Sequence, residues 1–124
     1  MEFLLVFLGG GIGTAARHGV NMFVARFVGT SYPLGTLCIN VLGAFAMGVV
    51  VEYWALRTGL PQQARLFLTT GILGGFTTFS TFALEVALLN ERGQTLAAIG
   101  YVLASLVLGV GGLYAGMALV RAAT

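Results

Sequence analysis

Four long apolar runs limit how this chain can fold more than any other feature of its sequence. They extend from about Phe3 to Val28, Leu34 to Leu56, Ala64 to Leu89 and Thr95 to Val120. A helix needs about 20 mostly apolar residues to cross the hydrocarbon core of a bilayer, so each run is long enough to span it. Charged residues make up only 8% of the chain, against about 25% in soluble domains. The sequence therefore predicts an all-α membrane protein in which residues 1–124 form a single four-helix transmembrane domain.

The links between these runs are short. They are Gly29–Pro33, Arg57–Gln63 and Asn90–Gln94. Short links between long helices favour antiparallel neighbours, so we expect a compact up-down bundle. The first run lacks a basic region before it and continues beyond its glycines, which predicts a retained span rather than a signal peptide.

Composition excludes several functional classes. The chain has one His, one Cys and no Asp, which leaves no credible catalytic set, so we do not expect an enzyme. A net charge of +2 is too small for a nucleic-acid interface. The single cysteine, Cys38, rules out an internal disulfide and is expected to be a small buried hydrophobe.

The arginines leave the orientation in the membrane open. With both termini in the cytoplasm, Arg57, Arg65 and Arg121 lie inside, whereas Arg26 and Arg92 lie outside. This is a weak positive-inside bias. The chain therefore inserts either in one orientation or in both, with the two orientations pairing antiparallel. Because four thin helices fill their own centre with side chains, a transport function would require a homo-oligomer.

The third run contains an unusual stretch near its middle, from Thr69 to Phe82. It combines three glycines with several hydroxyl residues, and a glycine pair followed by two threonines favours the end of one helix and the start of another. The sequence thus predicts a broken third helix. At such a break, the carbonyl groups of Gly74 and Thr77 can bind a small cation, while the start of the second half attracts an anion. The alternative is a glycine-kinked helix whose hydroxyls bond to its own backbone.

Several polar and aromatic side chains can line an ion path beside this break. Thr36 and Asn40 share a face of the second run, and a buried Asn in lipid either joins helices or lines a polar path. Phe79 and Phe82 are neighbours on one helix face, and the positive edges of their rings can contact an anion. Other hydroxyl donors are Ser80, Thr81, Tyr101 and Ser105. Because donors outnumber carboxylates, these residues favour an anion pathway beside a fixed structural cation, without naming the anion.

Two charged residues lie deep enough in the runs to need an explanation, because charges within a membrane are costly and mark functional sites. Arg17 lies in the first run and either holds a wet, positive vestibule or makes a structural hydrogen bond. Glu85 lies in the third run and is either an ion-pair partner or gate on the pathway, or a side chain that simply reaches the interface.

Three segments carry a resemblance to a known family. They are Gly10–Arg17, Gly35–Phe45 and Gly71–Phe82. In these segments, and in length, number of spans and motif order, the chain resembles the CrcB/Fluc family of fluoride channels. The third segment is the most specific. His18 follows Arg17 at a position where the family often has an aromatic residue.

The resemblance implies a dual-topology antiparallel homodimer in the plasma (inner) membrane, with two fluoride pathways and a central structural sodium ion. The sodium ion would be held by the Gly74 and Thr77 carbonyls of both copies. Phe79 and Phe82 would edge the pathways, with Asn40 beside them. Further contacts with fluoride would come from Ser80, Thr81, Tyr101 and Ser105, with Glu85 along the route. The implied function is passive export of fluoride, which protects the cell.

Two other functions remain open from the residues. Small four-helix proteins also serve as dual-topology, proton-coupled multidrug exporters, for which a carboxylate deep in the membrane is needed; Glu85 is the one candidate here. A second alternative is an accessory subunit that transports nothing and uses its glycines only for assembly.

Overall fold

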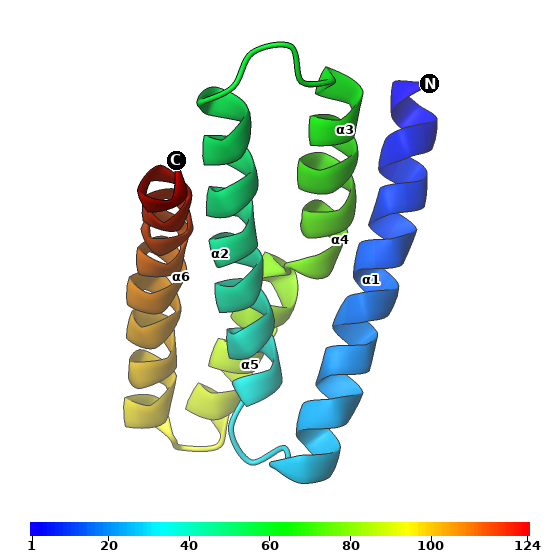
Figure 1. The fold of residues 1–124 in the computed structure, drawn as a ribbon. Coiled ribbons are helices and arrows are strands. Elements are labelled where there is room, and N and C mark those ends of the chain that lie inside the picture. Colours follow the sequence, from blue (N-terminus) through cyan, green and yellow to red (C-terminus); the bar gives the residue numbers. More distant parts are fainter.

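The computed structural model describes residues 1–124 and consists of helices only. Four segments are long and apolar enough to cross a membrane, as the sequence predicts (Figure 1). The first, second and fourth are α1 (Glu2–Phe27), α2 (Leu34–Ala55) and α6 (Thr95–Ala123). The third runs from Gln62 to Glu91. Both chain termini lie at the end of the bundle that also carries the α2–α3 link.

The third segment is divided into four helical pieces. They are α3 (Gln62–Leu66), the π-helix η1 (Phe67–Leu73), α4 (Gly74–Phe76) and α5 (Phe79–Glu91). Between α4 and α5, Thr77 and Thr78 have extended backbones with ψ of 157° and 121°. The π-helix was not predicted, because its i→i+5 bonding leaves no periodicity that distinguishes it from an α-helix in a uniformly apolar run.

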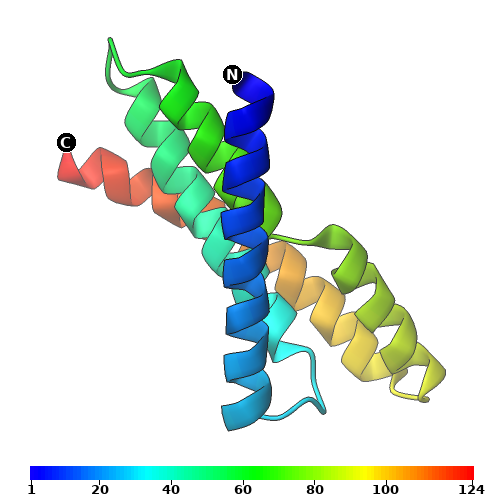
Figure 2. The ribbon, with the colours of Figure 1, turned by 90° about the vertical axis from the view of Figure 1, so that its right-hand side faces the viewer.

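At two interfaces, elements pack with their backbones in close contact. On one side α1 packs against η1 and α4, and on the other α2 packs against α6. Glycines make both approaches possible: a Cβ atom at Gly13 would lie 2.0 Å from the Ile72 carbonyl oxygen, and one at Gly48 would lie 2.1 Å from the Leu113 carbonyl oxygen. Small residues are the usual means of close helix packing in lipid. Figure 2 shows that α5 and the first half of α6 extend away from α1.

The α5–α6 link turns sharply at Gly93, whose φ of +78° favours glycine. The Gly93 amide donates to the Asn90 carbonyl (3.0 Å), and the Gln94 amide donates to the Leu89 carbonyl (2.9 Å). This pair of bonds is a Schellman motif, which ends a helix at a defined residue. It ends α5 at Glu91, with Arg92 as the C-cap residue before the turn.

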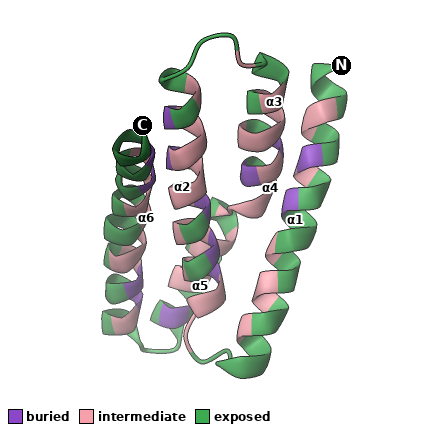
Figure 3. Cartoon of the chain, in the orientation of Figure 1, coloured by how far each residue is buried: buried purple, intermediate pink, exposed green.

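Few residues are shielded by the chain itself: 14 of the 124 are buried, and most of each helix is exposed or half-buried (Figure 3). Many of the exposed residues are large and apolar. This surface suits lipid, which is as apolar as the side chains. Cys38 is exposed on α2, so its predicted burial was wrong; a small apolar thiol needs no protein cover in this solvent. The most buried large side chains are Ile39 and Tyr101.

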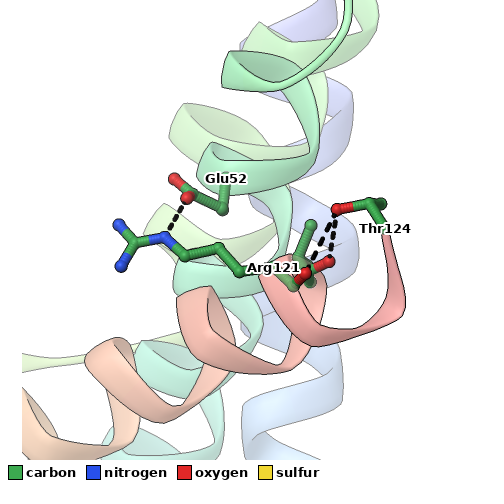
Figure 4. A network of polar contacts seen from close by, with 4 residues as sticks. Glu52, Arg121 and Thr124 are labelled. Atoms are coloured by element: carbon green, nitrogen blue, oxygen red, sulfur yellow. Dashed lines mark hydrogen bonds and ion pairs between the residues drawn. The ribbon is translucent and has the colours of Figure 1, made fainter.

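The ends of α2 and α6 are joined by an ion pair between Glu52 and Arg121 (Figure 4). The Glu52 side chain is nearly buried, whereas that of Arg121 is more than half exposed. One turn further, the Thr124 hydroxyl donates to the Val120 carbonyl at 3.0 Å and closes the end of α6. These contacts fix the α2–α6 pair at the end of the bundle that carries the termini.

Candidate functional site

The extended residues between α4 and α5 are held by one side chain from another helix. Asn40 of α2 accepts a hydrogen bond from the Thr78 amide at its Oδ1 atom (2.8 Å) and donates from Nδ2 to the Thr78 carbonyl (3.0 Å). Backbone groups at membrane depth must be paired within the protein, since lipid offers no partner. Asn40 therefore supplies both partners that Thr78 loses by leaving the helix, and we call this pair of bonds the Asn40 clamp.

The Asn40 clamp changes which carbonyl groups are free. In a continuous α-helix the Thr78 amide would donate to the Gly74 carbonyl, four residues earlier. It donates to Asn40 instead, so the Gly74 carbonyl loses its helical partner. The Thr81 amide would likewise donate to the Thr77 carbonyl, but it donates to the Thr78 hydroxyl (3.3 Å), which caps α5. Two specific contacts thus release the two carbonyls that the sequence singles out.

Further contacts hold Thr77 and the neighbouring Gly75 in place at the break. Its amide and its hydroxyl both donate to the Leu73 carbonyl, each at 3.0 Å. A Cβ atom at Gly43 of α2 would lie 2.2 Å from the Thr77 methyl group, so only glycine leaves room for Thr77 there. The Thr14 hydroxyl of α1 donates to the Gly75 carbonyl at 3.4 Å. The chain contains no group of three or more His, Cys, Asp or Glu residues that could hold a metal, so a cation at this break would rely on carbonyl oxygens.

An open depression of about 340 Å³ lies on the outer face of the chain at the break. Asn40, Thr77, Thr78 and Phe79 line it together with small and apolar residues of α2 and α6. Phe79 is 79% exposed, and Gly74 is exposed as well. The structure therefore brings the predicted residues Asn40, Thr77 and Phe79 to one surface, which nothing in the single chain covers.

Aromatic rings continue from this depression into the protein. The ring centroids of Phe79 and Phe82 are 5.6 Å apart, and those of Phe82 and Tyr101 are 5.2 Å apart. Tyr32, from the link before α2, packs edge-on against Tyr101 at 5.8 Å. The predicted phenylalanine pair is thus in contact. Sequence reasoning missed Tyr32, since a residue in a short link gives no sign of the helix that it will cover.

Beyond the rings lies a polar group of side chains. The Tyr101 hydroxyl donates to the Glu85 carboxylate at 3.1 Å, and Tyr101 is fully buried. Thr36 is also buried, and it lines a pocket of about 90 Å³ together with Asn21, Tyr32 and Glu85. This hydrogen bond engages the one hydroxyl proton of Tyr101, and the expectation that Tyr101 offers this proton to an anion stays a prediction.

The remaining predicted residues have different surroundings. The Ser105 hydroxyl is buried and has no hydrogen-bond partner, and the Arg17 Nε atom shares this property. Thr81 takes part in the cap of α5 through its backbone amide. Ser80 is exposed on the first turn of α5. Arg17 lies on α1 and lines neither the depression nor the pocket beside Thr36.

Comparison with known proteins gives one consistent result. A family model described as CrcB-like protein, Camphor Resistance (CrcB), matches residues 4–117. A protein of Granulibacter bethesdensis is 57% identical over 121 residues, covering 98% of this chain and 95% of the relative. One of Methylobacterium nodulans is 56% identical over 121 residues, covering 98% and 97%. One of Rhodopseudomonas palustris (strain BisB5) is 52% identical over the whole of both chains.

These three relatives are each named fluoride-specific ion channel FluC. The resemblance read from three sequence segments is therefore confirmed over nearly the full length. The proton-coupled alternative finds no support among these relatives.

Proposed function

This chain belongs to the CrcB-like family, and on that premise we propose that it forms a fluoride-specific channel that exports fluoride passively and protects the cell from it. The chain is a multi-pass membrane protein, which in bacteria means the plasma membrane. Its family consists of ion channels rather than enzymes. The details of the proposal, namely the cation, the second copy and the route of fluoride, rest on the geometry at the break.

The observation that carries the proposal is the Asn40 clamp. It leaves the carbonyls of Gly74 and Thr77 without their helical partners at membrane depth, where a free carbonyl is costly. A hard monovalent cation such as sodium is stabilised by carbonyl oxygens, so these two groups fit a structural sodium ion. Sodium would supply a fixed positive charge near the anion path.

A second copy of the chain accounts for the open face. Ca²⁺ and Mg²⁺, the best-described hard cations in proteins, take about six or more oxygen ligands, and two carbonyls from one chain are too few for a comparable site. Irregular backbone is also tolerated in a bilayer only where protein or a water-filled cavity covers it. Two copies related by an axis through the break would supply four carbonyls and cover both depressions. Antiparallel insertion fits the weak arginine bias.

The fluoride route would follow the side chains that extend inward from the depression. Asn40 keeps one amide hydrogen beyond the clamp, and the edges of Phe79 and Phe82 carry positive partial charge. The unpaired Ser105 hydroxyl is a further donor. Ser80, Thr81, Thr36 and Tyr101, with Glu85, would form the rest of the route, and Arg17 a vestibule. A narrow donor-lined path can replace the hydration of a small anion while excluding larger ones.

The test is fluoride efflux from liposomes that contain the purified protein, followed with a fluoride electrode. We expect rapid fluoride efflux, little chloride efflux, and loss of fluoride efflux when sodium is replaced throughout by a large organic cation. Folded, membrane-inserted protein that passes no fluoride in sodium would refute the channel. Undiminished efflux without sodium would refute the cation alone.

A further inference from the structure

A second small pocket lies beside the polar pocket next to Thr36 and shares part of its lining. The pocket beside Thr36 has a volume of about 90 Å³ and the second one about 100 Å³. Glu85, Thr30 and Pro33 line both, so the two pockets meet at Glu85. The second pocket also has Arg92 in its wall. Residues of the α1–α2 link line both pockets, and this link comes to the same end of the bundle as the α5–α6 link (Figure 1).

The chemistry of the second pocket suits a small anion. Thr30 and Ser31 offer hydroxyl donors, and Arg92 offers a guanidinium group that is always charged. The Schellman motif at Gly93 fixes the position from which the Arg92 side chain extends. Glu91, the residue before Arg92, is exposed and lines neither pocket. Arg26, near the end of α1, is also exposed and lines neither pocket.

Glu85 poses an electrostatic problem that this arrangement offsets. A carboxylate on an anion route repels the anion, and between close charges near a protein surface the repulsion is several times its value in water. Arg92 lies in the wall of the same pocket, so its positive charge acts on the approaching anion at the place where the Glu85 charge opposes it.

We propose that these two pockets form the mouth of the fluoride route at this end of the chain, and that Arg92 collects the anion there and offsets the charge of Glu85. The inference rests on the proposed channel function. It assigns the α1–α2 link, through Thr30 and Ser31, a direct part in the route.

The experiment compares Arg92→Gln with the wild-type protein in the fluoride efflux assay, at fluoride concentrations well below saturation. At about 10 mM ionic strength we expect efflux to fall roughly three- to ten-fold, and at about 0.5 M we expect the difference to shrink below about two-fold, since salt screens an exposed charge. Arg92→Lys keeps the charge and should retain most of the efflux. Arg26→Gln is the matched control, because Arg26 is exposed and lies outside both pockets.

A double-mutant cycle makes the test specific. If Arg92 offsets the Glu85 charge, Arg92→Gln should reduce efflux much less in a Glu85→Gln background than in wild type. Equal losses for Arg92→Gln and Arg26→Gln would show only a general surface potential and overturn the inference. An unchanged Arg92→Gln channel at low salt would also overturn it. A wild-type protein without fluoride efflux would instead refute the underlying channel function.

Discussion

The close contact between α1 and the π-helix gives the sharpest single prediction. An alanine Cβ at Gly13 would lie 2.0 Å from the Ile72 carbonyl oxygen and 2.8 Å from the Phe76 amide nitrogen. Both are backbone atoms, so no side chain can rotate away. Because ordinary contact begins at 3.4 Å, the two backbones would have to separate by about 1.4 Å.

We expect Gly13→Ala to lower the free energy of unfolding by about 1–3 kcal/mol, the usual cost of forcing extra atoms into a packed contact. The displaced elements are η1 and α4, which lead directly to the carbonyl of Gly74. Sodium-dependent fluoride efflux should therefore fall together with stability. Thermal unfolding in detergent and efflux from liposomes, measured on the same preparation, test both effects.

Gly11→Ala provides the matched control. Gly11 lies on the same helix, yet a Cβ atom there meets nothing within 4 Å. Alanine favours a helix over glycine by about 1 kcal/mol in water, so this variant should be as stable as the wild type or slightly more so. If Gly13→Ala and Gly11→Ala unfold and conduct alike, the tight backbone contact between α1 and η1 does not exist in the membrane.

Substitutions at three further positions test the site and the helix pair that supports it. Asn40→Ala removes two hydrogen bonds in the membrane, so it should lower the free energy of unfolding by about 1–3 kcal/mol and abolish sodium-dependent efflux. Asn40→Asp keeps the acceptor for the Thr78 amide and should retain part of the sodium-dependent efflux. Thr78→Val removes the cap of α5 and should raise the sodium concentration for half-maximal efflux, whereas Thr78→Ser should not. Glu52→Gln should lower the unfolding midpoint by a few degrees with fluoride efflux per folded protein unchanged, since its partner Arg121 lies at the far end of α2 and α6. A retained sodium dependence in Asn40→Ala, equal behaviour of the two Thr78 variants, or a selective loss of efflux in Glu52→Gln would each contradict the assigned role.

The spans could be read from the sequence because a bilayer imposes one strong requirement, namely about 20 apolar residues for each crossing. The four observed segments begin and end within a few residues of the predicted runs. The contact between Phe79 and Phe82 could also be predicted, since residues three apart on a helix are neighbours.

Contacts between distant segments could not be read in the same way. Polar residues on an apolar helix stand out, so Asn40 was identifiable as important, but nothing local says that it pairs with Thr78, which is 38 residues away. The same holds for Tyr32, which packs on Tyr101 of α6. The partner of a side chain depends on how helices are placed side by side, and in lipid this placement depends on small residues whose pattern does not specify a register.

The Asn40 clamp explains why a short stretch of glycines and hydroxyls can hold a non-helical backbone in the membrane. Glycine at position 43 lets Thr77 approach α2, and this approach brings Thr78 within reach of Asn40 one turn away on the same helix. Asn40 then satisfies Thr78, the Thr78 hydroxyl satisfies Thr81, and the carbonyls of Gly74 and Thr77 are left free. The two carbonyls without helical hydrogen-bond partners thus belong to one short stretch of backbone, where a bound cation would stabilise them. This is the physical reason why the interruption and the proposed cation site belong together: without the ion, closing the helix would be the better use of the same backbone groups.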